Sequence, residues 1–152
     1  AAGLPPGPRA EAEATEENGF RLMQAMLASR DALTAVLCAT DRLAVGALRA
    51  IAAAGLRAGR DVSVIGYDDL PVATFTDPPL TSFDPMVDQA AERLVGTLRA
   101  LLRGAPIQSE APLIGARLIA RASDGPAPTA AASRRVGSRR GGSVAHAARS
   151  DG

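Results

Sequence analysis

The 152-residue chain has no tryptophan, one tyrosine, one cysteine and one histidine. A lone cysteine cannot form an intramolecular disulfide, and one cysteine with one histidine cannot build a zinc site or a Cys–His nucleophile pair. No apolar run reaches the roughly 18 to 20 residues that cross a bilayer, and Ala1–Ala10 lacks the basic head and apolar block of an export signal. We therefore expect a cytoplasmic protein with no cofactor and no membrane partner, in which Cys38 is a small buried thiol.

Sequence motifs for phosphate binding and catalysis are also missing. The chain has neither a Gly-x-Gly-x-x-Gly loop nor a Walker-type loop, so a phosphate cradle has no support. Asp68 and Asp69 could be paired carboxylates, but adjacent side chains in an extended segment point apart, and no nucleophile stands nearby. We expect that the chain is not an enzyme.

Charge is divided unevenly along the chain. Residues 1 to 124 carry 12 Arg against 15 acidic residues, whereas residues 125 to 152 carry five Arg against one acid, with no lysine anywhere. From Ser123 onward the composition falls to Ala, Gly, Ser, Pro and Arg, without an aromatic residue to stack on bases. The sequence predicts a flexible lead over 1–14, a folded unit over 15–123, and a solvated, disordered tail over 124–152, in which weak DNA attraction is the less favoured alternative.

Helical and strand patterns alternate through the folded unit. Thr15 is a candidate N-cap for a helix that ends near Ser29, and the apolar run from Thr34 to Ala39 predicts a strand buried on both faces. The next helix covers 42–54, with Asp41 as its expected cap. A second buried strand over 62–65 then leads to the polar loop 67–71.

The second half of the folded unit predicts a helical turn near Pro71, an extended segment over 80–83, a helix from Pro85 to about Arg103, and a strand within 112–120. The long helix has a broad apolar stripe formed by Val87, Ala90, Ala91, Leu94, Leu98, Leu101 and Leu102. Such a stripe needs a partner surface. Strands that alternate with helices predict an α/β fold with a mostly parallel sheet flanked by helices.

Four blocks of the sequence carry a family resemblance: Thr34–Ala50, Gly55–Arg57, Asp61–Asp69 and Pro78–Ser82. In this order and spacing they resemble the effector-binding core of the LacI/GalR family of bacterial transcriptional regulators. The resemblance covers about residues 15 to 123, and Leu118–Ser123 is similar to the closing strand of the family, which usually ends in a basic and a hydroxyl residue. It implies part of a type I periplasmic binding protein-like fold.

The same resemblance implies which parts of a regulator this chain contains. In the family, a helix-turn-helix, a hinge helix and an amino-terminal subdomain precede the matched segment, and none of them is in this sequence. The helix over 86–103 belongs by resemblance to that other subdomain, so its stripe would be bare. We expect the effector-binding and dimerisation portion of a regulator that reaches operator DNA only through the missing helix-turn-helix. Alternatives are a sugar-binding protein of a transport system and a non-functional remnant.

Residue roles also follow from the resemblance. Asp68 takes the place of the aspartate that accepts hydrogen bonds from a sugar or ribose in the cleft, and its alternative is to cap a nearby turn. Thr40 stands where members often have Asn, another effector contact, and Tyr67 either lines the cleft or packs in the core. The effector is expected to be a sugar or a related polyol or nucleoside.

A homodimer interface is the second expectation from the family. By resemblance, helix 42–54 and the loop at 74–76 lie where family dimers meet, and the predicted interface residues are Val45, Arg49 and Thr76. Gly46 would permit a close helix approach there. Packing within the same chain is the alternative for each of these residues.

Overall fold

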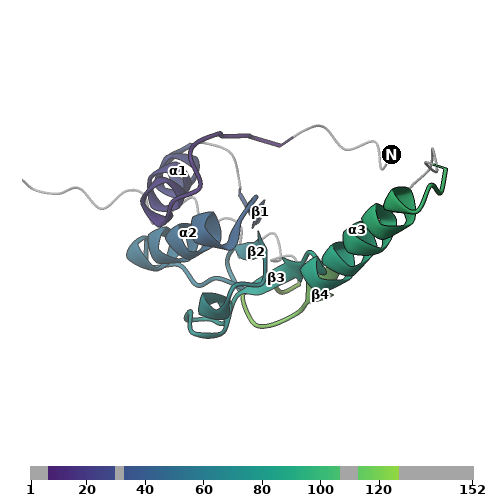
Figure 1. The fold of residues 1–152 in the computed structure, drawn as a ribbon. Coiled ribbons are helices and arrows are strands. Elements are labelled where there is room, and N and C mark those ends of the chain that lie inside the picture. Colours follow the sequence, from purple (N-terminus) through teal and green to yellow (C-terminus); the bar gives the residue numbers. More distant parts are fainter. Residues whose placement is uncertain (1–6, 30–32, 107–112, 127–152) are drawn as a thin grey trace, which may run out of the picture.

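The computed structural model describes residues 7–29, 33–106 and 113–126. Its elements in chain order are α1 (Glu16–Ala28), β1 (Ala35–Leu37), α2 (Asp41–Ala53), β2 (Ser63–Tyr67), the 3-10 helix η1 (Pro71–Thr74), β3 (Thr81–Asp84), α3 (Val87–Leu102) and β4 (Arg117–Ile119). Figure 1 shows how they are arranged. No helix within these ranges is long and apolar enough to cross a membrane.

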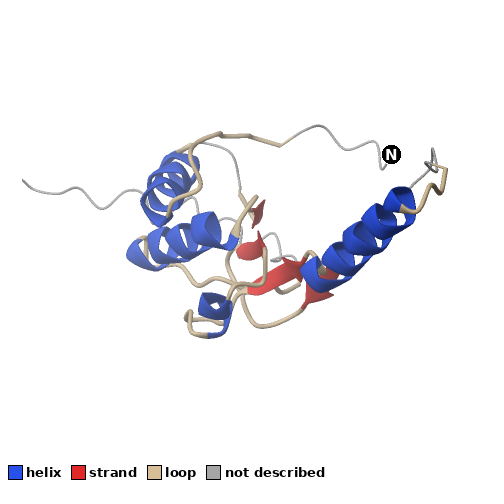
Figure 2. Cartoon of the chain, viewed as in Figure 1, coloured by secondary structure: helices blue, strands red, loops and turns tan. Residues whose placement is uncertain are grey.

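The four strands form one sheet in the order β1-β2-β3-β4 (Figure 2). β1, β2 and β3 are parallel, with Val36 opposite Val64 and Ile65 opposite Thr81. β4 is antiparallel to β3 and places Leu118 opposite Phe83. The predicted α/β class with a mostly parallel sheet is confirmed.

Hydroxyl caps begin both helices of the amino-terminal part. The Thr15 side chain accepts a hydrogen bond from Asn18 N at 3.2 Å, as expected for the cap of α1. The cap of α2 is Thr40, whose Oγ1 accepts from Leu43 N at 3.3 Å. The prediction that Asp41 caps α2 is therefore wrong, because its carboxylate points into the interior and bonds to other segments.

The helices α1 and α2 cross at two glycines. A Cβ on Gly46 would lie 2.0 Å from the Glu16 carbonyl oxygen, and one on Gly19 would lie 2.2 Å from the Leu43 carbonyl oxygen. Across the same contact Arg42 Nε donates to Glu16 Oε1 at 2.9 Å, and this bond lowers the pKa of Glu16 to about 2. Gly46 thus serves packing within the chain, and its expected role in a dimer contact is wrong.

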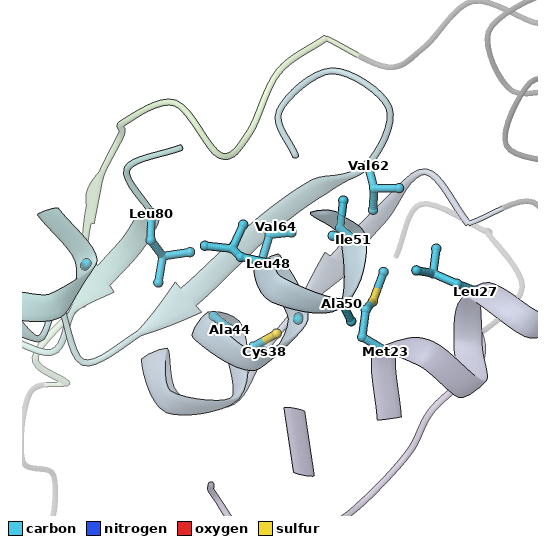
Figure 3. Packing of buried hydrophobic residues seen from close by; sticks show 12 residues of the cluster. Met23, Leu27, Cys38, Ala44, Leu48, Ala50, Ile51, Val62, Val64 and Leu80 are labelled. Atoms are coloured by element: carbon cyan, nitrogen blue, oxygen red, sulfur yellow. The ribbon is translucent and has the colours of Figure 1, made fainter. Parts of the chain in front are cut away.

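The hydrophobic core lies between these helices and one face of the sheet (Figure 3). Its fully buried or nearly buried members are Met23 and Leu27 of α1, Ala44, Ala47, Leu48, Ala50 and Ile51 of α2, and Cys38, Val62, Val64, Ala73 and Leu80. The side chains of Ile51, Val64 and Leu80 have no exposed surface. Burial of this apolar surface is the main term that stabilises the fold.

The other face of the sheet is open within the described residues. Leu37 is 70% exposed and Tyr67 is 37% exposed. Side chains alternate across a strand, so these residues point away from the face that carries Val36 and Val64. The predicted burial of the first strand on both faces is wrong because α1 and α2 lie together on one side of the sheet (Figure 1).

The segment after β4 is hydrogen-bonded to β2 and β3. Ser123 is fully buried, and its Oγ donates to Val64 O at 2.6 Å and accepts from Thr81 N at 2.8 Å. Asp124 accepts from Thr81 Oγ1, and Gly125 N donates to Ser63 Oγ at 3.2 Å. The ordered contacts therefore continue past the predicted boundary at residue 123, while residues 127–152 of the predicted tail lie outside the described residues.

The helix α3 differs from the rest of the fold because it has no buried residue. It extends away from α1 and α2 in Figure 1. Leu94 is 71% and Leu102 is 79% exposed. The expectation of an uncovered apolar stripe is confirmed for the described residues.

Candidate functional site

Polar residues gather where the three parallel strands end. Thr40 and Asp41 follow β1, Asp68 and Asp69 follow β2, and Asp84 is the last residue of β3. Parallel strands bring their carboxyl ends to one edge of the sheet, which is where open α/β sheets bind ligands. This edge is the candidate site.

A buried hydrogen-bond network holds the backbone segments of this edge in place. Asp41 is completely buried; its Oδ1 accepts from Ser82 Oγ at 2.5 Å and its Oδ2 accepts from Leu70 N at 2.7 Å. Ser82 Oγ also accepts from Asp69 N at 3.2 Å. Gly66 leaves room for this carboxylate, because a Cβ there would lie 2.1 Å from Asp41 Oδ1. The network ties the ends of β1, β2 and β3 together.

An arginine from the segment after β4 completes the support. Arg121 Nη2 lies 2.7 Å from Asp69 Oδ1, and Arg121 Nη1 donates to Leu80 O at 2.7 Å. Sequence reasoning did not assign Arg121 or Ser82 to the site. The signal for Arg121 was present as the basic residue near the end of the closing strand, whereas Ser82 has no distinguishing pattern.

Asp68 has a different environment from the other carboxylates of this edge. Its backbone has φ 111°, and Asp69 follows with φ 48°, both in the region that L-residues rarely adopt. Asp68 N donates to Phe83 O at 2.9 Å, which fixes the backbone. Within the described residues no hydrogen bond or ion pair uses the Asp68 carboxylate. Partial burial, and secondarily the nearby Asp41 carboxylate, raises the pKa of Asp68.

The other two predicted contact residues lie at the same edge. Thr40 is half-buried, and its hydroxyl is engaged as the cap of α2. The ring of Tyr67 lies 6.4 Å from the ring of Phe83 and keeps 37% of its surface exposed. Tyr67 is therefore on the open face rather than in the core.

The predicted dimer residues fall on α2 and just after η1. Val45 is half-buried, and the exposed Arg49 places its guanidinium 5.5 Å from the centre of the Phe20 ring. Thr76 donates to Ala73 O at 3.2 Å and to Pro78 O at 2.9 Å. Next to it Phe75, which belongs to the same predicted loop, is 86% exposed.

The described side chains of this edge offer hydrogen-bond donors and acceptors. Among the described residues there is no cluster of three His, Cys, Asp or Glu side chains that could hold a metal ion. Burial, with a smaller effect of Asp41, raises the pKa of Cys38 to about 11, so its thiol stays protonated and unreactive near neutral pH.

Comparison with known proteins identifies the family. Residues 1–123 match the family described as periplasmic binding protein-like domain. The chain belongs to this family. It is 40% identical over 114 residues to the HTH-type transcriptional regulator MalR of Streptomyces coelicolor, a match that covers 75% of this chain and 33% of MalR. The regulator AglR of Rhizobium meliloti is 40% identical over 119 residues, again over 75% of this chain and 33% of its own.

Solved structures of the family give the same result. The lac repressor dimer bound to operator and the anti-inducer ONPF matches with a TM-score of 0.68 and 33% identity, over 74% of this chain and 39% of that chain. A LacI family regulator from Arthrobacter sp. FB24 in complex with lactose matches with a TM-score of 0.67 and 29% identity, over 74% and 42%. The resemblance to LacI-type regulators is confirmed. The chain spans about one third of the length of these curated relatives.

Proposed function

We propose that the chain supplies the carboxyl-terminal half of an effector-binding cleft in a transcriptional regulator, with Asp68 as its principal polar contact. The observation that carries this proposal is the contrast among the carboxylates of the strand-end edge. Asp41 is engaged by Ser82 and Leu70, and Asp69 by Arg121, whereas the Asp68 carboxylate has no such bond within the described residues.

A carboxylate held in this way is suited to sugar hydroxyls. It only accepts hydrogen bonds, and its two oxygens can accept two neighbouring hydroxyls. The positive φ of Asp68 and Asp69 costs free energy, and such strain persists at sites where it positions a functional group. Thr40 and Tyr67 flank Asp68 as further contacts, one polar and one aromatic.

The ligand class is a sugar or a related polyol or nucleoside. The Arthrobacter relative, which matches this chain with 29% identity, is in complex with lactose. The relatives MalR and AglR are named as transcriptional regulators, which favours regulation over transport. Effector binding between two subdomains would shift their relative orientation and so change the DNA affinity of the whole regulator.

A homodimer is part of the same proposal. The contact surface would include Val45, Arg49 and Thr76. The exposed Phe75 would be the main apolar side chain of this surface. Aromatic side chains dominate the binding energy of such interfaces. The lac repressor relative is itself a dimer in its solved structure.

The test is a chimera in which residues 15–126 replace the matching part of the Arthrobacter regulator, with lactose binding measured by calorimetry. Asp68→Ala should weaken binding by about 1 to 3 kcal/mol, the cost of removing a charged hydrogen-bond acceptor. Asp77→Ala is the matched control, because Asp77 is an exposed carboxylate before β3, away from the strand-end edge. Unchanged lactose affinity in the Asp68→Ala chimera would refute the assignment.

A further inference from the structure

The backbone at Asp68 and Asp69 has a conformation that favours glycine. Asp68 has φ 111° and Asp69 has φ 48°. Residues with a side chain adopt such angles at a cost in free energy, and they keep them only where surrounding contacts fix the chain. The contacts that fix these two residues therefore decide where the Asp68 carboxylate lies.

Two backbone N–H groups tie this loop to β3. Asp68 N donates to Phe83 O at 2.9 Å. Asp69 N donates to Ser82 Oγ at 3.2 Å. Neither bond involves a side chain of the loop, so the two bonds hold the backbone and leave the directions of both carboxylates to other contacts.

The side chain of Asp69 meets the guanidinium of Arg121. Asp69 Oδ1 is buried and has no hydrogen-bond partner among the described residues, and Arg121 Nη2 forms an ion pair with it at 2.7 Å. The two side chains are 23% and 16% exposed, whereas both partners of the Arg42–Glu16 pair are about half exposed. A buried carboxylate that loses its cation is strongly unfavourable. Without Arg121, the Asp69 side chain would turn towards water and draw the strained backbone with it.

Arg121 is also fixed by contacts that do not involve Asp69. Its backbone N donates to Thr81 Oγ1 at 2.8 Å, and its Nη1 donates to Leu80 O at 2.7 Å. A guanidinium carries its donors in a fixed planar arrangement, so it can hold two partners at once in a way that a lysine cannot. Arg121 therefore joins Asp69 to the start of β3.

We propose that Arg121 is a positioning residue for effector binding, because its ion pair with Asp69 holds the Asp68 carboxylate in the direction that meets the effector. Arg121 acts without touching the effector, since both Nη atoms are engaged within the chain. This inference rests on the function proposed above for Asp68. It adds that the affinity of the strand-end edge depends on a residue of the segment after β4.

Two other roles for Arg121 lead to different results. A residue that only stabilises the fold would lower the free energy of unfolding and leave the affinity of the folded protein unchanged. A residue that touched the effector would contribute affinity whether or not the Asp68 carboxylate is present. Positioning of Asp68 predicts a loss of affinity that disappears when that carboxylate is removed.

The first test uses the 152-residue chain and needs no effector. Amide hydrogen exchange of residues 68–70 is followed by NMR in the wild-type chain and in Arg121→Gln. The control Arg60→Gln removes an equal charge from an exposed position before β2, at the opposite end of that strand. Relative to amides of α2, exchange at residues 68–70 should rise roughly tenfold in Arg121→Gln and stay unchanged in the control. Unchanged exchange in Arg121→Gln would overturn the proposal, because the loop would keep its conformation without Arg121.

The second test measures lactose affinity by calorimetry in the chimera described above, which contains residues 15–126. Arg121→Gln and Asp69→Asn should each weaken lactose binding roughly tenfold, and Arg121→Lys should weaken it less because it keeps the charge. In an Asp68→Ala background, Arg121→Gln should cause no further loss. Arg60→Gln should bind lactose as the unsubstituted chimera does.

The outcomes separate this inference from the proposed function. Unchanged affinity in Asp68→Ala would refute the function of the edge, and this inference with it. A loss in Asp68→Ala without a loss in Arg121→Gln would overturn this inference alone. A loss from Arg121→Gln that persists in the Asp68→Ala background would also overturn it, because Arg121 would then act without Asp68. If Arg121→Gln does not fold, Asp69→Asn decides in its place, because it suits positive φ and leaves the bond from Arg121 to Leu80 O intact.

Discussion

The helices α2 and α3 have similar alanine- and leucine-rich sequences and opposite environments. Seven of the 13 residues of α2 are buried, against none of the 16 residues of α3. The apolar side of α2 is covered by α1 and by the sheet, whereas the large apolar side chains of α3 have no cover among the described residues. The contrast teaches that an amphipathic sequence specifies a helix and the side that needs a partner, but not where the partner is.

The largest expected difference concerns deletion of an apolar side chain from each helix. Ile51→Ala in α2 should lower the free energy of unfolding by about 2 to 5 kcal/mol, because the side chain is fully buried and its loss leaves a cavity. Leu98→Ala in α3 should change it by less than about 0.5 kcal/mol at dilute concentration. Urea unfolding followed by circular dichroism measures both. Equal losses would mean that α3 packs on the body of the protein.

Ser123 tests whether the segment after β4 is part of that body. Ser123→Ala should cost about 1 to 3 kcal/mol of unfolding free energy, because Val64 O and Thr81 N lose a buried partner. The matched control is Thr97→Ala on exposed α3, with a change near zero. Thermal unfolding compares the two variants. A neutral Ser123→Ala would remove the closing segment from the cooperative unit.

Glycines of the two helices should respond with opposite sign. Gly46→Ala should destabilise the fold by about 1 to 3 kcal/mol, because the added methyl group would meet the backbone of α1. At Gly96 in α3 nothing lies within 4 Å of the added atom, so Gly96→Ala should stabilise the helix by about 0.5 to 1 kcal/mol. Helix content and denaturant midpoints give the comparison. Tolerance of Gly46→Ala would contradict the close crossing of α1 and α2.

The ionised Asp68 carboxylate should lower the free energy of unfolding, because it is held partly buried near Asp41. The folded pKa of Asp68 lies above its unfolded value, so the ionised group weakens the fold as pH rises through that pKa. Asp68→Asn removes the charge and suits positive φ, and it should raise the free energy of unfolding at pH 7 by about 0.5 kcal/mol. The control Asp88→Asn should lower the free energy of unfolding by roughly 0.3 kcal/mol, because it removes an acidic residue from the first turn of α3. Destabilisation by Asp68→Asn would show that the carboxylate has a structural partner.

The smallest effect is the acid dependence of the contact between α1 and α2. The Arg42 guanidinium lowers the pKa of Glu16 from 4.5 to about 2. Because the folded pKa is the lower one, the stabilisation is present above about pH 4.5 and is lost as pH falls towards 2. Glu16→Gln should flatten the decline of stability over this range in equilibrium unfolding, and Arg42→Gln should do the same. A decline that persists unchanged in both variants would assign the acid sensitivity to other groups.

The sequence predicts local features better than contacts between segments. Thr15 marks the start of α1 correctly, because capping depends on a few neighbouring residues. Asp41 was expected to cap α2, and its true partners, Ser82 and Leu70, are about 30 to 40 residues away along the chain. The open face at Leu37 was missed for a similar reason, since a hydrophobic run does not reveal how many layers cover it.

In the candidate site too, the sequence predicted the positions of residues better than their contacts with distant segments. Family resemblance predicted that Asp68, Thr40 and Tyr67 lie near one another, and the topology of parallel strands does bring all three to the same edge of the sheet. Their roles as ligand contacts stay a prediction. The contact between Arg121 and Asp69 was not predicted, because it forms only through the antiparallel return of β4, which the sequence did not indicate.

The central claim is that α1, α2 and the sheet form one cooperatively folded unit, from which α3 extends with its apolar side uncovered among the described residues. Hydrogen–deuterium exchange followed by mass spectrometry tests it most directly. At low protein concentration, amides of α2 and β2 should exchange only through global unfolding, while amides of α3 should exchange much faster. Protection of α3 equal to that of α2 in the dilute monomer would contradict the account.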